Sequence, residues 1–401
     1  MGNANRIIPA SRTATITYAI RDVVVLAEQV AATGKEMLYL NIGDPNLFDF
    51  ATPAHIIDAV TDAMRANHCG YAPSLGVPEA RKAILAEAAR KGINAVQHVF
   101  ITSGASEAID LCLTALVEPG ENVLTPVPGY PFYTAMLSKL QARENFYYLD
   151  ESNGWQPDVD DIAAKINDKT RAIVVVNPNN PTGSLTGHDT LQAIVDLAAE
   201  RNLVIFADDI YDKLLFDGAK HVPIASLSSD VPVVTFNGLS KSYLAPGFRL
   251  GWGIISGPDD RLTDYIEAIN KMLRARLSAN HPEQWAVPAA LEGDQSHIDR
   301  AIAKLTRRRD LTVEMLNAID GITCQKPGGA FYAFARLHTH KPDAQFAAAL
   351  LRRTGVVVVP GSGFGQVPGT QHFRVVFLPD ETILQEAYRR IEEYMPIFLR
   401  Y

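Results

Sequence analysis

Short apolar runs alternate with amphipathic stretches along most of the chain. The apolar runs are rich in β-branched residues and lie at residues 98–101, 122–125, 171–176, 203–207 and 231–236. Runs of this length predict β-strands, and their continuous apolar character indicates a sheet that is covered on both faces. Amphipathic segments, of which 52–66 and 188–201 are the clearest, predict helices between the strands. The alternation therefore predicts an α/β fold with a mostly parallel sheet.

The pattern changes after about residue 285. This part predicts helices at 296–318, 342–354 and 380–395, strands at 356–360 and 372–378, and two strands around a glycine turn within 321–337. Helices and strands in this order are typical of a small α+β unit. We therefore expect two domains, a large one over residues 46–284 and a smaller α+β domain made of 1–45 and 285–401.

Composition and charge narrow the possible classes of protein. The chain has 401 residues, of which 47% are hydrophobic and 20% are charged, as in ordinary globular proteins. The formal net charge of −8 argues against nucleic acid as a partner, because phosphate binding needs clustered lysine and arginine. The basic cluster that stands out is Arg307 to Arg309, which we expect on a solvated helix face.

The cysteines and the apolar segments bear on the compartment. Cys69, Cys112 and Cys324 match no metal-binding motif and form no disulfide framework, so we expect no metal site and a reducing environment. The N-terminal residues lack an apolar signal core, and no stretch reaches the ~20 continuous apolar residues of a membrane span. These features predict a cytoplasmic protein with no membrane contact.

Chemically useful side chains follow four of the predicted strands. They occur at residues 103–106, 177–183, 208–211 and 240–241. In open α/β sheets, ligands bind outside the carboxyl ends of the strands. Four such ends with polar groups therefore indicate one shared site.

Two of these segments have both a functional and a purely structural interpretation. The turn Ser103 to Ser106 opens a helix directly after a strand, where free N–H groups make an anion site, although either serine would also serve as a plain N-cap. Asp208 and Asp209 end the predicted strand at 203–207, and their side chains must face opposite ways. Only one of the two can therefore face a site, and an aspartate at a strand end can also simply cap a turn.

Lys241 indicates a functional site more specifically than these two segments do. It lies in a small-residue turn between Ser240 and Ser242, with Arg249 shortly after. A partly desolvated lysine beside a second cation has a lowered pKa and is a nucleophilic amine that forms an imine with an aldehyde. The alternative is an ordinary surface lysine. The nearby hydroxyls and Arg249 suit a cofactor that carries both an aldehyde and a phosphate.

A glycine-rich segment later in the chain imitates a dinucleotide loop. Gly361, Gly363 and Gly365 follow an apolar strand, but position 366 is Gln366 and the residues after it are not helical. The dinucleotide fingerprint requires a glycine and a helix there. We therefore discard a nicotinamide dehydrogenase.

Taken together, the motifs resemble a known family. NPNNPTG at 177–183, ADDIYD at 207–212, SKSYLAPGFRLGW at 240–252 and HFRVVF at 372–377 are similar to those of the class I/II aminotransferases. These are pyridoxal-phosphate enzymes with the aspartate aminotransferase fold (fold type I), which has a seven-stranded, mostly parallel large sheet. LNIGDPNLFDF, GYAPSLGVPEAR and TFNGLSKSY resemble most the bacterial glutamate–pyruvate (alanine) aminotransferases.

The resemblance implies roles for matching positions. Lys241 matches the lysine that binds the cofactor covalently and then moves a proton, and Asp208 matches the carboxylate that pairs with the pyridine nitrogen. Tyr71 matches a tyrosine that reaches the phosphate in a partner subunit, which implies a homodimer. The remaining matches are Tyr211 and Asn180 at the phenolic oxygen, Tyr130 stacked on the ring, Gly104, Ala105, Ser106, Ser240 and Arg249 around the phosphate, and Gly43, Asn180 and Arg374 at the substrate.

The sequence departs from the family at two of these motifs. Gly238 stands where many relatives have a hydroxyl, so Ser240 must carry more of the phosphate contact. Asp209 stands where many relatives have glutamate, and we expect little effect because this side chain should point away from the ring.

The function implied is amino-group transfer between an amino acid and a 2-oxo acid by a ping-pong mechanism, with alanine or glutamate and pyruvate or 2-oxoglutarate. A β-lyase of the same fold and a transaminase with aromatic or branched-chain specificity are the alternatives. A DNA-binding regulator of this fold is disfavoured by the short, weakly basic N-terminus. Apolar groups near Tyr18, Ile20 and Phe331 would favour small or aromatic substrates, and no second substrate-binding arginine is identified.

Overall fold

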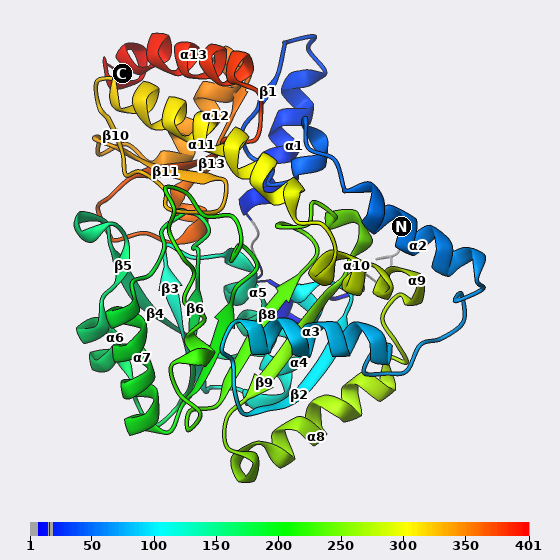
Figure 1. Ribbon diagram of the computed structural model, residues 1–401. Coiled ribbons are helices and arrows are strands. Elements are labelled where there is room, and N and C mark those ends of the chain that lie inside the picture. Colours follow the sequence, from blue (N-terminus) through cyan, green and yellow to red (C-terminus); the bar gives the residue numbers. More distant parts are fainter. Residues whose placement is uncertain (1–6, 15, 17–18, 401) are drawn as a thin grey trace, which may run out of the picture.

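A computed structural model describes residues 7–14, 16 and 19–400. Its large sheet has eight strands in the order β2-β9-β8-β7-β6-β3-β4-β5 (Figure 1). Their bounds are β2 Val96–Thr102, β3 Asn122–Val127, β4 Arg143–Asp150, β5 Gln156–Pro157, β6 Thr170–Val176, β7 Val204–Asp208, β8 Val233–Gly238 and β9 Gly251–Ser256. The neighbouring strands β4, β3, β6, β7 and β8 are parallel, and β9 is antiparallel to both of its neighbours. The eighth strand beyond the expected seven is the two-residue β5, antiparallel to β4.

Helices cover both faces of this sheet, as the continuous apolar strands predict. In β6, Ile173 and Val175 pack in one apolar cluster while Ala172 and Val174 pack in another. The first face is covered by α2 Ala54–Arg65, α3 Pro78–Arg90, α6 Val159–Lys165, α7 His188–Arg201 and α10 Ala286–Glu292, and the second by α4 Ala105–Leu116, α5 Pro131–Lys139 and α8 Asp259–Ala275. Successive strand residues point to opposite faces, so burial on both requires an unbroken apolar run.

A second, smaller sheet lies at one end of the molecule (Figure 1). It is antiparallel, with the order β10-β11-β14-β13, and its strands are β10 Ile322–Cys324, β11 Tyr332–Leu337, β13 Val359–Pro360 and β14 His372–Val376. A separate pair joins β1 Leu38–Tyr39 to β12 Val356–Val357 in parallel. The helices gathered there are α1 Ala19–Ala31, α11 Ser296–Asn317, α12 Asp343–Thr354 and α13 Glu381–Arg400.

The single strand expected at 356–360 is divided in the structure. Its first half pairs with β1 and its second half with β14, and the buried Val358 separates them. The apolar run was the correct signal for strand, but the partners differ along it. The residues after Val376 are buried without belonging to β14, and α13 continues past the expected end at 395.

The short helix α10 bears on the division into domains. It lies beyond residue 284, yet it packs on α2 and α3 against the large sheet, while α1 packs on α12 near the small one. We therefore propose the two expected domains with their second boundary moved to the start of α11 at Ser296. The short α9 His281–Gln284 also packs on α2.

The expectation of a solvated arginine face on α11 is wrong. Arg307 is exposed, but Arg308 and Arg309 are buried, because three successive residues of an α-helix point in directions about 100° apart. Arg308 Nη1 and Nη2 donate to the Asp49 carboxylate at 2.8 Å each, and Arg309 donates to Asp217 at 2.8 and 2.9 Å. The hydrogen bonds from Arg308 lower the pKa of Asp49 to about 2.

Candidate active site

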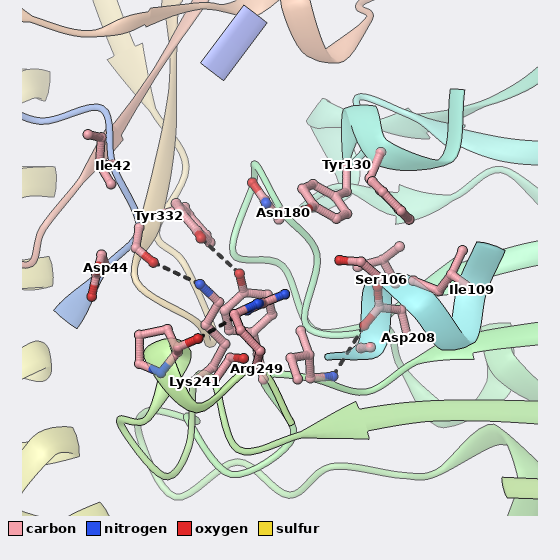
Figure 2. Close-up of a pocket in the computed structure, with 18 of the residues that line it drawn as sticks. Ile42, Asp44, Ser106, Ile109, Tyr130, Asn180, Asp208, Lys241, Arg249 and Tyr332 are labelled. Atoms are coloured by element: carbon pink, nitrogen blue, oxygen red, sulfur yellow. Dashed lines mark hydrogen bonds between the residues drawn. The ribbon is translucent and has the colours of Figure 1, made fainter. Parts of the chain in front are cut away.

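One cavity of about 660 Å³ lies at the carboxyl ends of the large sheet, beside the small sheet (Figure 2). The parallel strands β6, β7 and β8 supply Val176, Asp208 and the turn that carries Lys241, while Arg374 comes from β14 of the small sheet. Site residues named from the sequence that line this cavity are Gly43, Ala105, Ser106, Tyr130, Asn180, Asp208, Tyr211, Ser240, Lys241, Arg249 and Arg374. The four strand ends therefore do converge on one site.

Lys241 lies half-buried in the turn after β8. Its Nζ donates a hydrogen bond to the backbone oxygen of Gly43 at 2.7 Å. Burial lowers the pKa of Lys241 to about 8; Asp44 opposes this shift, and the positive charges of Arg374 and Arg249 add to it. A substantial fraction of this amine is therefore neutral and nucleophilic near pH 8, which excludes the interpretation as an ordinary surface lysine.

Asp208 is buried at the end of β7. Tyr133 Oη donates to its Oδ2 at 3.2 Å, and the Ile210 N–H donates to its Oδ1 at 3.4 Å. Burial raises the pKa of Asp208 to about 7, because no cation among the described residues forms an ion pair with it. This carboxyl group faces the cavity and suits a ligand that brings a positive charge.

The neighbouring Asp209 faces away from the cavity. Its Oδ1 lies 3.4 Å from Nε2 of the buried His221. Asp209 is absent from the cavity lining, whereas Asp208 is part of it. The expectation that only one of the two aspartates faces the site is confirmed.

The N-terminus of α4 and the side chain of Arg249 form the cationic end of the cavity. Gly104 does not line the cavity, but it is the N-cap of α4, with φ +82°, and no side chain caps this helix. Glycine is required at residue 104 because L side chains rarely adopt this φ, and it also lets Arg249 Nη2 lie close, 2.5 Å from where a Cβ would stand. Within the described part of the chain, no carboxylate pairs with Arg249. Free N–H groups of α4 and an exposed guanidinium together make an anion site, and the plain N-cap alternative for Ser103 or Ser106 is excluded.

Arg374 is held in a fixed orientation by its neighbours. Its Nη1 donates to Asn180 Oδ1 at 3.0 Å, and its Nη2 donates to the Asn41 carbonyl oxygen at 2.6 Å. The guanidinium carbon lies 4.6 Å from the centre of the Tyr332 ring and 4.7 Å from that of Phe364. This buried, pre-oriented cation suits a planar carboxylate.

The comparisons with known proteins agree with this geometry. A family model described as "Aminotransferase class I and II" matches residues 35–391. The chain belongs to the class I and II aminotransferase family. It is 41% identical to the glutamate-pyruvate aminotransferase AlaA of Haemophilus influenzae over 90% of this chain and 91% of that protein. It is 39% identical to AlaA of Escherichia coli K12 over 92% of this chain and 93% of the relative.

Comparison with solved structures confirms the aminotransferase fold. An alanine aminotransferase from Pyrococcus furiosus superposes with a TM-score of 0.94 at 41% identity and covers 97% of this chain and 100% of its own. An aspartate aminotransferase from Rhizobium meliloti superposes with a TM-score of 0.89 at 29% identity, over 97% of this chain and 98% of its own. The expected fold class, a mostly parallel α/β sheet with a smaller α+β unit, is confirmed.

The aminotransferase uses pyridoxal 5′-phosphate, and its cavity fits this cofactor. The buried Asp208 matches a cationic ring nitrogen, the amine of Lys241 matches the aldehyde, and the cationic end at α4 and Arg249 matches the phosphate. Burial raises the pKa of Tyr211 well above its usual value, which keeps this phenol a hydrogen-bond donor. The cavity of this aminotransferase thus offers matching groups for the ring nitrogen, the aldehyde and the phosphate, while Gly238 supplies no hydroxyl and Tyr71 does not line it.

Tyr71 does not line the cavity of its own chain. Its side chain is 82% exposed. The sequence expectation that it serves a partner subunit is consistent with this exposure. Tyr18 lies outside the described residues, as does the side chain of Ile20, and Phe331 is buried behind Tyr332.

Sequence reasoning missed several residues of the site. Tyr133 holds Asp208, Asp44 acts on Lys241, Tyr332 Oη lies 2.8 Å from Tyr211 Oη, and Phe364 covers Arg374. Phe364 belongs to the glycine-rich segment that imitates a dinucleotide loop. Asp44 and Phe364 lie within segments singled out from the sequence, but no local pattern gives these four residues their roles, which only long-range packing reveals.

Two further kinds of site are not found in the described part of the chain. Groups of three or more histidine, cysteine or acidic side chains that would hold a metal ion do not occur there. Nor is any described helix long and apolar enough to cross a membrane.

Proposed function

We propose that this aminotransferase exchanges the amino group between alanine or glutamate and the corresponding 2-oxo acids, pyruvate and 2-oxoglutarate. The observation that carries the proposal is the convergence of the Lys241 amine, the buried Asp208 carboxyl and the pre-oriented Arg374 in one cavity. Relatives named glutamate-pyruvate and alanine aminotransferases at 39–41% identity support the choice of substrates.

Arg374 and Lys241 would act on the substrate itself. Arg374 binds the substrate α-carboxylate through two parallel N–H groups, with Gly43 and Asn180 beside it, and so orients the α-carbon toward Lys241. When bound, pyridoxal phosphate supplies the electron sink that allows the α-carbon to lose its proton. The Lys241 Nζ would hold the cofactor aldehyde and, once the substrate amine takes its place there, would be free to accept the proton from the substrate α-carbon and to deliver it again.

Other residues hold the cofactor in place. Asp208 keeps a proton on the ring nitrogen, which strengthens the electron sink. Tyr211 and Asn180 donate to the phenolic oxygen, and Tyr130 packs against the ring. Ser240, Arg249 and the first turn of α4, Gly104 to Ser106, bind the phosphate. The lowered pKa of Lys241 allows its amine to serve as a base near neutral pH.

A half-reaction screen tests the proposed substrates. Holoenzyme is mixed with single amino acids, and the loss of its yellow colour is followed together with the oxo acid released. Alanine and glutamate should bleach the cofactor fastest and regenerate it from pyruvate or 2-oxoglutarate with ping-pong kinetics. Preference for aromatic or branched-chain amino acids would refute the substrate choice, and pyruvate with ammonia in the absence of an acceptor would identify a β-lyase instead.

We further propose a cytoplasmic homodimer in which Tyr71 completes the partner's phosphate site. The three cysteines are free thiols, which suits a reducing compartment. Besides Tyr71, large apolar side chains exposed on the chain include Leu47, Met64 and Leu277, and an Ala72 N–H to Ser278 Oγ hydrogen bond of 3.3 Å holds the segment of Tyr71 beside that of Leu277. Exposed apolar side chains of this kind are typical of an interface.

Subunit complementation tests the position of Tyr71. Tyr71→Ala and Lys241→Ala are purified separately, denatured, mixed and refolded, so that hybrid dimers form. A hybrid carries one site with both wild-type residues if Tyr71 acts across the interface, and about a quarter of all sites are then restored. Activity above the Tyr71→Ala level supports the proposal. No gain in the mixture, with hybrids present by mass spectrometry, would place Tyr71 outside the partner's site.

A further inference from the structure

A charged bridge joins the two sheets outside the cavity. Glu151 follows β4 of the large sheet, and its Oε2 accepts hydrogen bonds from Arg336 Nη1 at 2.9 Å and from His372 Nε2 at 3.2 Å. Arg336 and His372 are direct cross-strand partners on β11 and β14 of the small sheet. One carboxylate from the large sheet therefore meets two side chains of the small sheet.

The hydrogen bonds around His372 fix the position of its ring. Asp343 accepts from the Ser362 N–H and hydroxyl at 2.7 Å each and from Gln366 Nε2 at 2.8 Å, which fixes the orientation of the Gln366 amide. Gln366 Oε1 then faces His372 Nδ1 at 3.0 Å. The buried ring of His372 is therefore held at Nδ1 by Gln366 and at Nε2 by Glu151.

Glu151 anchors this ring to the large sheet. His372 is buried, with its ring stacked on Phe334 at 4.7 Å and 5° and the edge of Trp155 at 5.6 Å. Burial of Glu151 would raise the pKa of its carboxyl, but the bonds and charges of His372 and Arg336 lower it overall. Loss of the Glu151 carboxylate would leave the facing polar groups of Arg336 and His372 without their hydrogen-bond partner.

The bridge is connected to Arg374 by direct packing. His372 and Arg374 are two residues apart on β14 and therefore lie on the same face of the small sheet. Phe334, the cross-strand partner of Arg374, stacks on His372 and contacts Phe364 edge-on at 6.1 Å, and Phe364 lies against the Arg374 guanidinium. A shift of His372 would displace this aromatic stack and hence the guanidinium.

We propose that Glu151 and His372 are positioning residues that hold the small sheet, and with it Arg374, at the distance from Lys241 that substrate carboxylates require. The inference rests on the proposed role of Arg374. Glu151 is the fixed point on the large sheet, and His372 transmits its position to the strand that carries Arg374. Neither residue lines the cavity, so neither contacts the substrate directly.

Binding of two matched probes tests the inference. 2-Methylalanine has no α-proton, so it binds to the holoenzyme without losing one, and tert-butylamine, with a methyl group in place of the carboxylate, has no α-proton either. The apparent Kd of each is measured by the absorbance change of the bound cofactor. For Glu151→Gln and His372→Gln we expect the Kd of 2-methylalanine to rise about tenfold and that of tert-butylamine to stay within about twofold. Glu151→Asp keeps the carboxylate on a shorter side chain, so its Kd for 2-methylalanine should lie between those of the wild type and Glu151→Gln.

Three further variants separate the possible outcomes. Glu121→Gln is the matched control. Glu121 pairs with Arg171 at 3.0 Å at the amino-terminal ends of β3 and β6, whereas the cavity lies at the carboxyl ends. This variant should bind both probes as the wild type does. In the double variant Glu151→Gln/His372→Gln both changes affect the same contact, so the rise in the Kd of 2-methylalanine should be smaller than the two single effects added together. Arg374→Lys should raise the Kd of 2-methylalanine and leave that of the probe without a carboxylate unchanged.

The results distinguish two kinds of failure. If Arg374→Lys binds 2-methylalanine normally, the proposed role of Arg374 is wrong. Suppose instead that Arg374→Lys binds 2-methylalanine weakly. If the folded variants Glu151→Gln and His372→Gln then bind both probes normally, or bind both probes more weakly to the same extent, the positioning role is wrong. Thermal unfolding of every variant shows which of them are folded.

Discussion

Lys241→Ala should lose transamination by at least about 10⁴-fold, because it removes both the covalent attachment and the general base. Among the residues that the structure describes, no other lysine lines the cavity, so none of them is placed to replace it. The half-reaction with alanine, followed by the colour of the cofactor and by pyruvate release, measures the loss. The cofactor itself should still bind, since Asp208, Arg249 and the N-terminus of α4 remain.

A second measurement on Lys241 does not depend on turnover. Borohydride reduction of wild-type holoenzyme should fix the cofactor mass on the peptide that contains residue 241, and this mass should be absent from Lys241→Ala. Lys220→Ala, which removes an exposed lysine on the surface, should behave like the wild type in both assays. Attachment at another lysine, or turnover in Lys241→Ala close to that of the wild type, would contradict the assignment.

Asp208→Asn should slow the half-reaction by roughly 10³-fold while the protein stays folded. Asparagine has the same shape as aspartate but carries no charge, so it cannot hold a proton on the ring nitrogen. The raised pKa of Asp208, about 7, belongs to a carboxyl group with no cation paired to it, and a protonated ring nitrogen beside it would lower that pKa again. Because asparagine cannot form this ion pair at any pH, the defect of the variant should persist between pH 6 and 9.

A cofactor analogue gives the test of this mechanism. Pyridoxal phosphate methylated on its ring nitrogen is permanently cationic, so it needs no proton from residue 208. We expect it to restore much of the rate in Asp208→Asn and to give no gain in the wild type. Asp260→Asn, an exposed aspartate at the start of α8, serves as the control with normal kinetics. Equal rates of Asp208→Asn with both cofactors would show that residue 208 does not act through the ring nitrogen.

The sequence alone determined the large sheet and the centre of the site. Strands buried on both faces need unbroken apolar runs, so β6 and β7 were predicted to within a residue or two from local composition. Lys241, Asp208 and the turn at Ser106 follow such strands directly. Because the carboxyl ends of parallel strands meet at one edge, their proximity followed from the order of the elements.

Other parts of the site were decided only by the tertiary structure. The partner of Arg374 is Asn180, 194 residues away, and the bridge from Glu151 to His372 spans 221 residues. The burial of Arg308 and Arg309 likewise depends on Asp49 and Asp217, which lie far from α11 in the sequence. A local pattern records whether a residue suits a helix or a strand; which distant group will neutralise its charge depends on how the two sheets pack together.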